Sequence, residues 1–340
     1  MPSKKHSAQL GAMGSAARQR MVAYVRTSGV YIALIVICIM MSIISPFFLT
    51  AANLLNVLLQ AATVSIIAAG LTVVLIAGEI DLSIGSLIGM TGSVAAVLII
   101  QADYPIGAGS LAALASGVIA GLFNGLATVA FQMPSFVVTL AMLGIAQGAG
   151  LLLTNGRPIS GFPSDFSVIG QGKIGPVAIP ILIAGLVYLI VHLMLTRTKF
   201  GIELYATGGG RRAAEMSGIK TNRVVVKSFV ISGLCSALAG IVLSSRLDAG
   251  NGNFGASNLL DAVAAAVVGG TSLTGGVGNV LGTLAGVLII AVIRNGLVLM
   301  NVQAFWQQVA VGSIILAAVV INQIVRGELS LASILRTLKR

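Results

Sequence analysis

The sequence has 340 residues, of which 57% are hydrophobic and 9% charged, and its mean hydropathy is +1.03. A soluble domain carries about 25% charged residues, so this composition excludes an ordinary soluble protein and indicates an integral membrane protein. The net charge of +11 does not indicate a nucleic-acid partner, because the basic residues flank apolar stretches, where a topology signal is expected.

Ten apolar segments approach the length of about 20 residues that a helix needs to cross a lipid bilayer. They are residues 28–44, 52–77, 84–101, 106–131, 134–153, 177–195, 224–244, 259–270, 280–299 and 305–321. The eighth is short and bounded by glycines, which predicts a half-helix or a re-entrant segment. The expected fold is all-α and integral to the membrane: a polytopic bundle of about ten transmembrane helices with broken or re-entrant segments.

Most basic residues gather in three places: an N-terminal tail (1–27), a loop (196–223) and a C-terminal tail (326–340). Six predicted spans separate the first cluster from the second, and four separate the second from the third. All three clusters therefore lie on one side of the membrane, and the positive-inside rule makes that side the cytoplasm. Residues 28–325 are expected to form the transmembrane domain, with the loop 196–223 and both termini of the chain in the cytoplasm.

Two carboxylates, Glu79 and Asp81, interrupt what would otherwise be two continuous apolar spans. Charged groups near the membrane are costly, and they mark functional sites by default. Asp81 and Ser83 are also suitable N-caps for a helix that begins near residue 84. The two interpretations are compatible: these residues either cap the helix, line a solute path or gate, or do both.

The loop 196–223 contains three consecutive glycines, followed by a short predicted helix over residues 211–217 that ends at Gly218. Arg211 and Arg212 open this helix, where the helix dipole disfavours cations. Local helix stability therefore does not account for the two arginines. They serve either as a topology signal at the lipid headgroups or as a docking surface for a cytoplasmic partner.

The stretch 261–278 surrounds a short apolar run with glycines and hydroxyl residues, among them Thr271 and Ser272. This pattern predicts a broken helix that could act as a gate, with Asp261 either capping the helix or facing the pathway. The sequence contains no P-loop motif, so we expect no ATP hydrolysis by that route. The two histidines, His6 and His192, are isolated, so no metal site is predicted, and nothing suggests a catalytic nucleophile.

Five segments together resemble the permease family of ribose-, xylose- and galactoside-type ABC importers. They are residues 78–85, 133–140, 154–159, 208–218 and 269–278, within a likeness that covers about residues 45–325. Two of these segments depart from the family's usual pattern. Glu79 stands where relatives often have glycine, and Gly210, Arg211 and Arg212 stand where relatives often have Asn-Pro-Glu.

The resemblance implies a permease subunit in a bacterial inner membrane. It implies a second permease subunit (a copy or a paralogue), a cytoplasmic ATP-binding subunit and a periplasmic sugar-binding protein. This chain would bind no cofactor, and the ATPase subunit would use the ATP. The short helix would be the coupling helix, with contacts from Arg211, Arg212, Ala213, Ala214, Glu215, Ser217 and Gly218.

Polar residues inside the predicted spans, namely Asn124, Thr139 and Gln147, are candidates for weak contacts with the solute. The solute path or gate would also include Glu79, Asp81, Ser83, Asp261, Thr271 and Ser272. One alternative is a secondary transporter in which Glu79 and Asp81 bind protons or sodium ions. Another is a structural or receptor membrane protein, which the many glycine-broken spans disfavour.

Overall fold

The structure is a computed structural model that describes residues 29–325, so the expectations for the two basic tails and His6 lie outside the described part. Each predicted apolar segment forms a helix, with bounds that differ from the prediction by at most four residues. The helices are the first helix (Gly29–Ile44), α2 (Ala51–Ile76), α3 (Ile84–Ala96) continued by the π-helix η1 (Val97–Gln101), α4 (Ile106–Ala130), α5 (Ser135–Leu153), α7 (Ile179–Arg197), α10 (Thr221–Leu247), α11 (Asn258–Val268), α12 (Val280–Leu299) and α13 (Ala304–Val325).

Seven of the helices within residues 29–325 are long and apolar enough to cross a membrane: α2, α3 with η1, α4, α5, α7, α10 and α12. The first helix and α11 are shorter apolar helices, and α13 has 22 residues. The all-α polytopic membrane fold expected from the sequence is confirmed.

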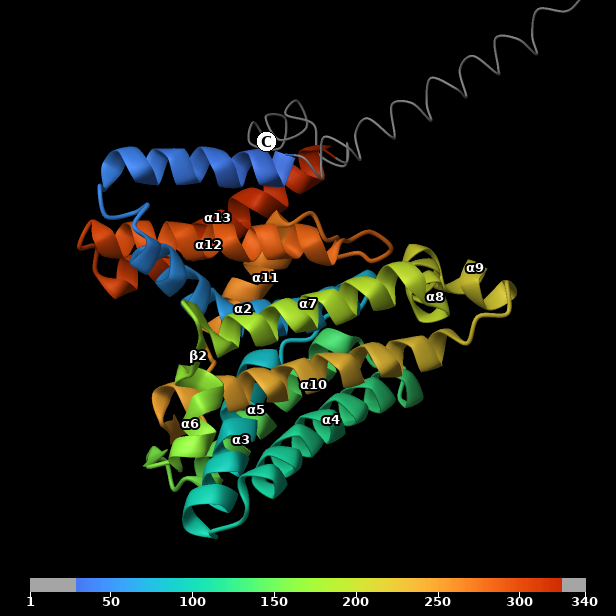
Figure 1. Ribbon diagram of the computed structural model, residues 1–340. Coiled ribbons are helices and arrows are strands. Elements are labelled where there is room, and N and C mark those ends of the chain that lie inside the picture. The colour runs from blue at the N-terminus through green and yellow to red at the C-terminus, as the bar shows by residue number, and fades with distance from the viewer. Residues whose placement is uncertain (1–28, 326–340) are drawn as a thin grey trace, which may run out of the picture.

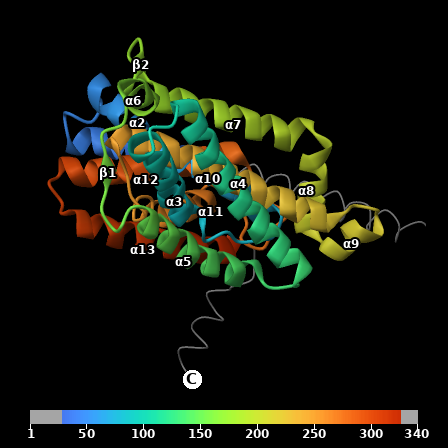
Figure 2. The ribbon, with the colours of Figure 1, turned by 90° about the horizontal axis from the view of Figure 1, so that it is seen from below.

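Short elements cap the two ends of the bundle (Figures 1 and 2). At one end lie α8 (Lys199–Gly209) and α9 (Arg211–Met216). At the other lie α6 (Ser164–Gln171) and two antiparallel pairs, β1 (Ile159–Ser160) with β4 (Ala249–Gly250) and β2 (Lys173–Ile174) with β3 (Val177–Ala178). Pairing of Ile159 with Gly250 ties the loop after α5 to the end of α10.

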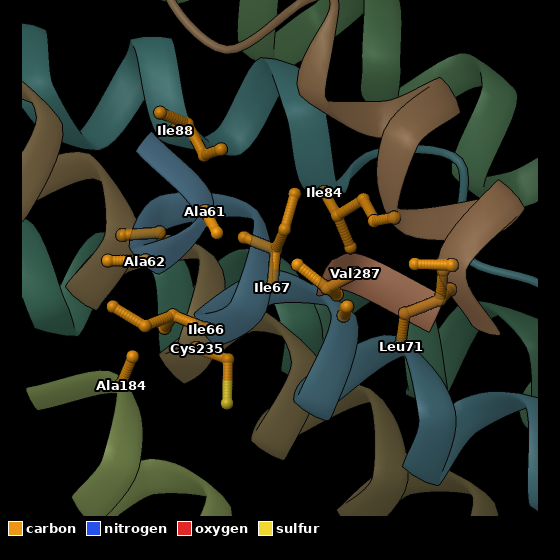
Figure 3. Packing of buried hydrophobic residues seen from close by; sticks show 14 of the residues in the cluster. Ala61, Ala62, Ile66, Ile67, Leu71, Ile84, Ile88, Ala184, Cys235 and Val287 are labelled. Carbon is orange, nitrogen blue, oxygen red and sulfur yellow. The ribbon is translucent and has the colours of Figure 1, made fainter. Parts of the chain in front are cut away.

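Helix α2 is the centre of the bundle. Of the most apolar 18-residue stretch of α2, 83% is buried inside the protein. The corresponding share is 28% for α4 and for α5, and 33% for α7. The main core cluster joins α2 to α3, α7, α10, α11 and α12, and Figure 3 shows part of it around Ile66, Ile67 and Leu71. The outer helices leave large apolar side chains exposed, which a soluble protein rarely does over such an area but which lipid accommodates.

Small residues let α4 and α10 approach closely. A Cβ atom added at Gly117 or Gly121 of α4 would collide with Gly233 or with the Phe229 carbonyl of α10. These glycines, spaced four residues apart on α4, therefore serve helix packing within the chain, since close backbone approach replaces the hydrophobic driving force that is missing in lipid.

The predicted eighth span is a half-helix. Its 11 residues rise about 16 Å, roughly half of a 30 Å hydrocarbon core. Before it, non-helical chain runs so close to α3 that a Cβ atom added at Gly85 or Gly89 would collide with the carbonyl oxygen of Gly255 or Gly252. Asn251, Gly252 and Gly255 of this stretch are buried in the protein, as expected for irregular backbone in a membrane protein.

Candidate functional site

The three glycine-rich segments singled out in the sequence meet at the end of the bundle that carries α8 and α9. The Gly276 N–H donates to the Ile76 carbonyl at 2.9 Å, and the Tyr205 hydroxyl donates to the Gly278 carbonyl at 2.8 Å. Gly208 packs between Ile76 and Gly276, so closely that an added Cβ atom would overlap the Ile76 carbonyl oxygen. The end of α2, helix α8 and the loop 269–278 thus form one packed unit, which we call the glycine junction.

The loop 196–223 holds two helices, where the sequence predicted one. The glycine triplet was expected to break the chain, and the break falls at its last residue: α8 continues through Gly209, and Gly210 separates it from α9. Helix α9 then ends in a Schellman motif. Gly218 has φ +83°, its N–H donates to the Glu215 carbonyl, and the Ile219 N–H donates to the Ala214 carbonyl. The predicted C-terminal stop at Gly218 is confirmed.

Arg211 links α9 to the loop between α2 and α3. Its guanidinium lies 3.3 Å from Glu79, donates to the Asn222 side chain at 2.8 Å, and lies 3.7 Å from Glu215. Arg212, Ala213 and Ser217 are exposed, whereas Ala214 packs inward. One arginine at the start of α9 is therefore held by the transmembrane domain, and the other faces outward.

Glu79 lies outside the helical spans, and its side chain is 12% exposed. Burial raises the pKa of the Glu79 carboxyl above its ordinary value, although a hydrogen bond with Ser135 and the nearby Arg211 guanidinium act in the opposite direction. The hydrogen bond with Ser135 and the ion pair with Arg211 thus both favour the charged form of this partly buried carboxylate.

Asp81 is fully buried and accepts three hydrogen bonds. One carboxylate oxygen accepts from the Ser83 N–H at 2.9 Å and the Ser83 hydroxyl at 2.6 Å, and the other accepts from the Ser232 hydroxyl of α10 at 2.8 Å. The Asn124 amide of α4 donates to Ser83 at 3.0 Å. The α2–α3 loop is thereby fixed to α4 and α10, and a buried carboxylate is satisfied in the way that its desolvation requires.

The capping roles predicted for the two aspartates are wrong. Ser83 occupies the N-cap position of α3, but neither its side chain nor that of Asp81 caps the helix; Asp81 instead stabilises the turn before it. Asp261 is the fourth residue of α11 and makes no cap. Its carboxylate accepts from the Arg294 guanidinium of α12 at 2.6 Å.

The remaining predicted path residues lie in separate places. Thr139 is buried beside the α2–α3 loop, where its hydroxyl contacts the carbonyls of Ser135 and Ile80. Thr271 and Ser272 are buried in the glycine junction. Gln147 donates to Asn253 at 3.1 Å, nearer the opposite end of α5. Only the residues from Glu79 to Ser83, with Asn124 and Thr139, form one cluster, and their role in a path or gate stays a prediction.

Ser232 is the partner of Asp81 that the sequence analysis missed. It is one of three buried serines, Ser228, Ser232 and Ser236, that recur every four residues on the apolar helix α10. This spacing puts them on one helix face, a signal that would have marked that face as a polar contact. Arg294 and Asn222 were missed as well, since nothing local shows which acceptor each of them meets.

Ser232→Ala will destabilise the protein by about 1.5–3 kcal/mol, because it removes a hydrogen bond to a buried carboxylate. Ser228→Ala is the matched control, since the Ser228 hydroxyl donates to the Val225 carbonyl of its own helix. Unfolding in lipid nanodiscs measures both variants. Equal stability of the two would contradict the role given to Ser232.

Comparison with known proteins places this geometry in context. A family model described as "Branched-chain amino acid transport system / permease component" matches residues 53–321. The chain is 40% identical to the ribose import permease protein RbsC of Bacillus subtilis over 87% of this chain and 92% of that protein. It is 38% identical to RbsC of Escherichia coli K12 over 86% and 92% of the two chains. It is 34% identical to the xylose transport system permease protein XylH of Haemophilus influenzae over 86% and 96%. No solved structure matches the chain.

Proposed function

Because the chain belongs to the transport permease family whose model matches residues 53–321, we propose that it is the permease subunit of an ATP-driven importer that carries a monosaccharide such as ribose, xylose or galactose across the bacterial inner membrane. The chain is a multi-pass membrane protein and a transport component rather than an enzyme. The observation that carries the proposal is its identity of 38–40% to ribose import permeases over more than four fifths of its length. These relatives favour a sugar over the branched-chain amino acid in the family description.

We propose that helix α9 is the part of the chain that contacts the ATP-binding subunit. Its outer surface offers Arg212, Ala213 and Ser217, and it follows α8, which packs in the glycine junction. In this proposal the loop 196–223 and both termini face the cytoplasm. Motion of the ATPase would reach the transmembrane helices along two connections: Arg211 to Glu79, and Gly208 to Ile76 and Gly276.

The complete transporter would contain a second permease subunit, a cytoplasmic ATP-binding subunit and a periplasmic sugar-binding protein. The solute path would open by alternating access, with α2, α3 and α10 shifting about the α2–α3 loop and the glycine junction. Asp81, Ser83, Asn124 and Thr139 are fully buried in the described structure, so a path that includes them requires such a shift. A ligand changes this equilibrium only through different affinities for the two states. Binding protein and ATP would supply that difference.

The ion-gradient alternative requires carboxylates that are free to bind protons or sodium ions. Asp81 is held by three hydrogen bonds, and Glu79 is paired with Arg211. No comparison supports this alternative.

Cells that lack their own sugar importers test the proposal, when they express this chain together with its ATP-binding and sugar-binding partners. We expect accumulation of labelled ribose or xylose that stops on ATP depletion and survives a protonophore. Labelled leucine, which the family description would suggest, should not accumulate. Uptake that survives ATP depletion but collapses with the protonophore would instead establish the ion-gradient alternative.

A further inference from the structure

A cavity of about 240 Å³ lies between α2, α10, α11 and α12. It occupies the halves of α2, α10 and α12 that are remote from α8 and α9, since its lining residues come from the start of α2 and the ends of α10 and α12. The volume corresponds to roughly eight water molecules at about 30 Å³ each, which is enough for one small polar solute.

Apolar and polar side chains both line the cavity. The apolar residues Ala61 and Val287 belong to the core cluster in Figure 3. The polar residues are Gln60, Arg246, Asn258, Asp261 and Arg294. Five hydrogen-bonding side chains around one cavity in a transmembrane bundle are costly to the fold, and such groups mark pathways for solutes or ions.

Packing alone does not account for these polar groups. The Asp261–Arg294 ion pair joins α11 to α12, yet the Arg294 Nε atom is buried without a hydrogen-bond partner among the described residues. Arg246 donates to the Leu59 carbonyl at 3.2 Å, and no carboxylate of the described chain lies within ion-pair distance of it. Gln60 uses its N–H group on Asn56, which leaves its carbonyl oxygen as an acceptor.

We propose that this cavity binds the transported solute, a neutral molecule rich in hydroxyl groups, in the half of the bundle remote from α8 and α9. A hydroxyl both donates and accepts, and the lining offers guanidinium donors beside carboxylate and amide acceptors. An anion would suit the arginines but would meet the Asp261 carboxylate. The inference rests on the proposed function, because it takes the solute to be a monosaccharide.

The test uses the full chain in phosphatidylcholine nanodiscs, without the ATPase. A cysteine introduced as Ala291→Cys reports on the cavity, because Ala291 lines it and contributes no polar group. Cys38 is changed to serine so that it does not react; Cys235 is buried. Leu288→Cys on the same helix is the matched control, since Leu288 is similarly part-exposed but does not line the cavity. Modification by the small neutral reagent methyl methanethiosulfonate is timed with and without D-ribose or D-xylose.

Saturating sugar should slow modification at residue 291 severalfold and leave residue 288 unaffected. Arg246→Met or Asn258→Leu, each added to the reporter, should weaken the protection about tenfold, because each removes hydrogen bonds to the solute. Gln308→Met, a comparable change away from the cavity, should leave protection unchanged.

Protection by inorganic phosphate but not by sugar would overturn the proposal in favour of an anion site. Protection that appears on adding phosphatidylglycerol to the nanodisc, and that sugar does not change, would overturn it in favour of a lipid headgroup. Protection by no probe would overturn it as well. If cells import the sugar but the cavity is not protected, this inference fails alone; if they import no sugar, the proposed function fails.

Discussion

Changing Arg211 and Arg212 together to glutamate should reduce sugar uptake at least about thirtyfold. This factor corresponds to the loss of an arginine contact at the interface that contributes roughly 2 kcal/mol or more. Arg212 is exposed at the start of α9, and Arg211 is 42% exposed. Charge reversal at Arg212 would repel the ATPase surface, and charge reversal at Arg211 would replace the ion pair with Glu79 by repulsion. ATP hydrolysis by the partner should persist without transport, because the catalytic groups belong to that subunit.

Two companion variants distinguish the docking of α9 on the ATPase from the ion pair between Arg211 and Glu79. Glu79→Gln removes the ion pair with Arg211 but leaves the outer surface of α9 intact. Arg212→Glu alone changes the outer surface and leaves the ion pair. Lys199→Glu reverses an exposed charge in the same loop and serves as the control. Size-exclusion chromatography checks that each permease is folded, and co-purification measures ATPase binding. Undiminished uptake in the arginine double variant would refute the docking role.

Gly208→Ala should destabilise the protein by about 2 kcal/mol or more and abolish uptake, since inserting a methyl group into a packed site forces the backbone apart. The added Cβ atom would overlap the Ile76 carbonyl oxygen, which accepts the hydrogen bond from Gly276. Helix α8 would have to leave the end of α2, and the glycine junction would open.

The neighbouring glycine provides a control of the same size and chemistry. A Cβ atom at Gly209 would meet nothing within 4 Å. Gly209→Ala should therefore be neutral or slightly stabilising, by up to about 1 kcal/mol, because alanine loses less entropy in a helix. Unfolding in nanodiscs and uptake in cells are measured for both. Identical behaviour of the two variants would show that the junction does not constrain α8.

The long helices of this fold were predictable because each is a long apolar run. Helix α8 was not foreseen. Its glycine triplet predicts a break, but Gly208 is used for close packing against Ile76, and only Gly210 ends the helix. The break predicted at the triplet therefore falls at Gly210, because close packing keeps Gly208 within the helix.

The sequence was sufficient to predict which three segments form the site, but not which of their residues contact each other. The costly carboxylates Glu79, Asp81 and Asp261 stand out in an apolar sequence, whereas their partners do not. Ser232 is 151 residues from Asp81, and Arg211 is 132 residues from Glu79. The sequence singled out Glu79 and Arg211 in separate segments, and only the structure shows that they form an ion pair.

The shortness of α11 has a consequence for how the protein is made. A segment of 11 residues is too short for the translocon to release into lipid on its own, since independent insertion requires about 20 apolar residues. Its aspartate would add a further cost until Arg294 of α12 is present to pair with it. We therefore expect α11 to wait in the insertion channel and to enter the bilayer together with α12, as a helical hairpin whose buried charges are already neutralised.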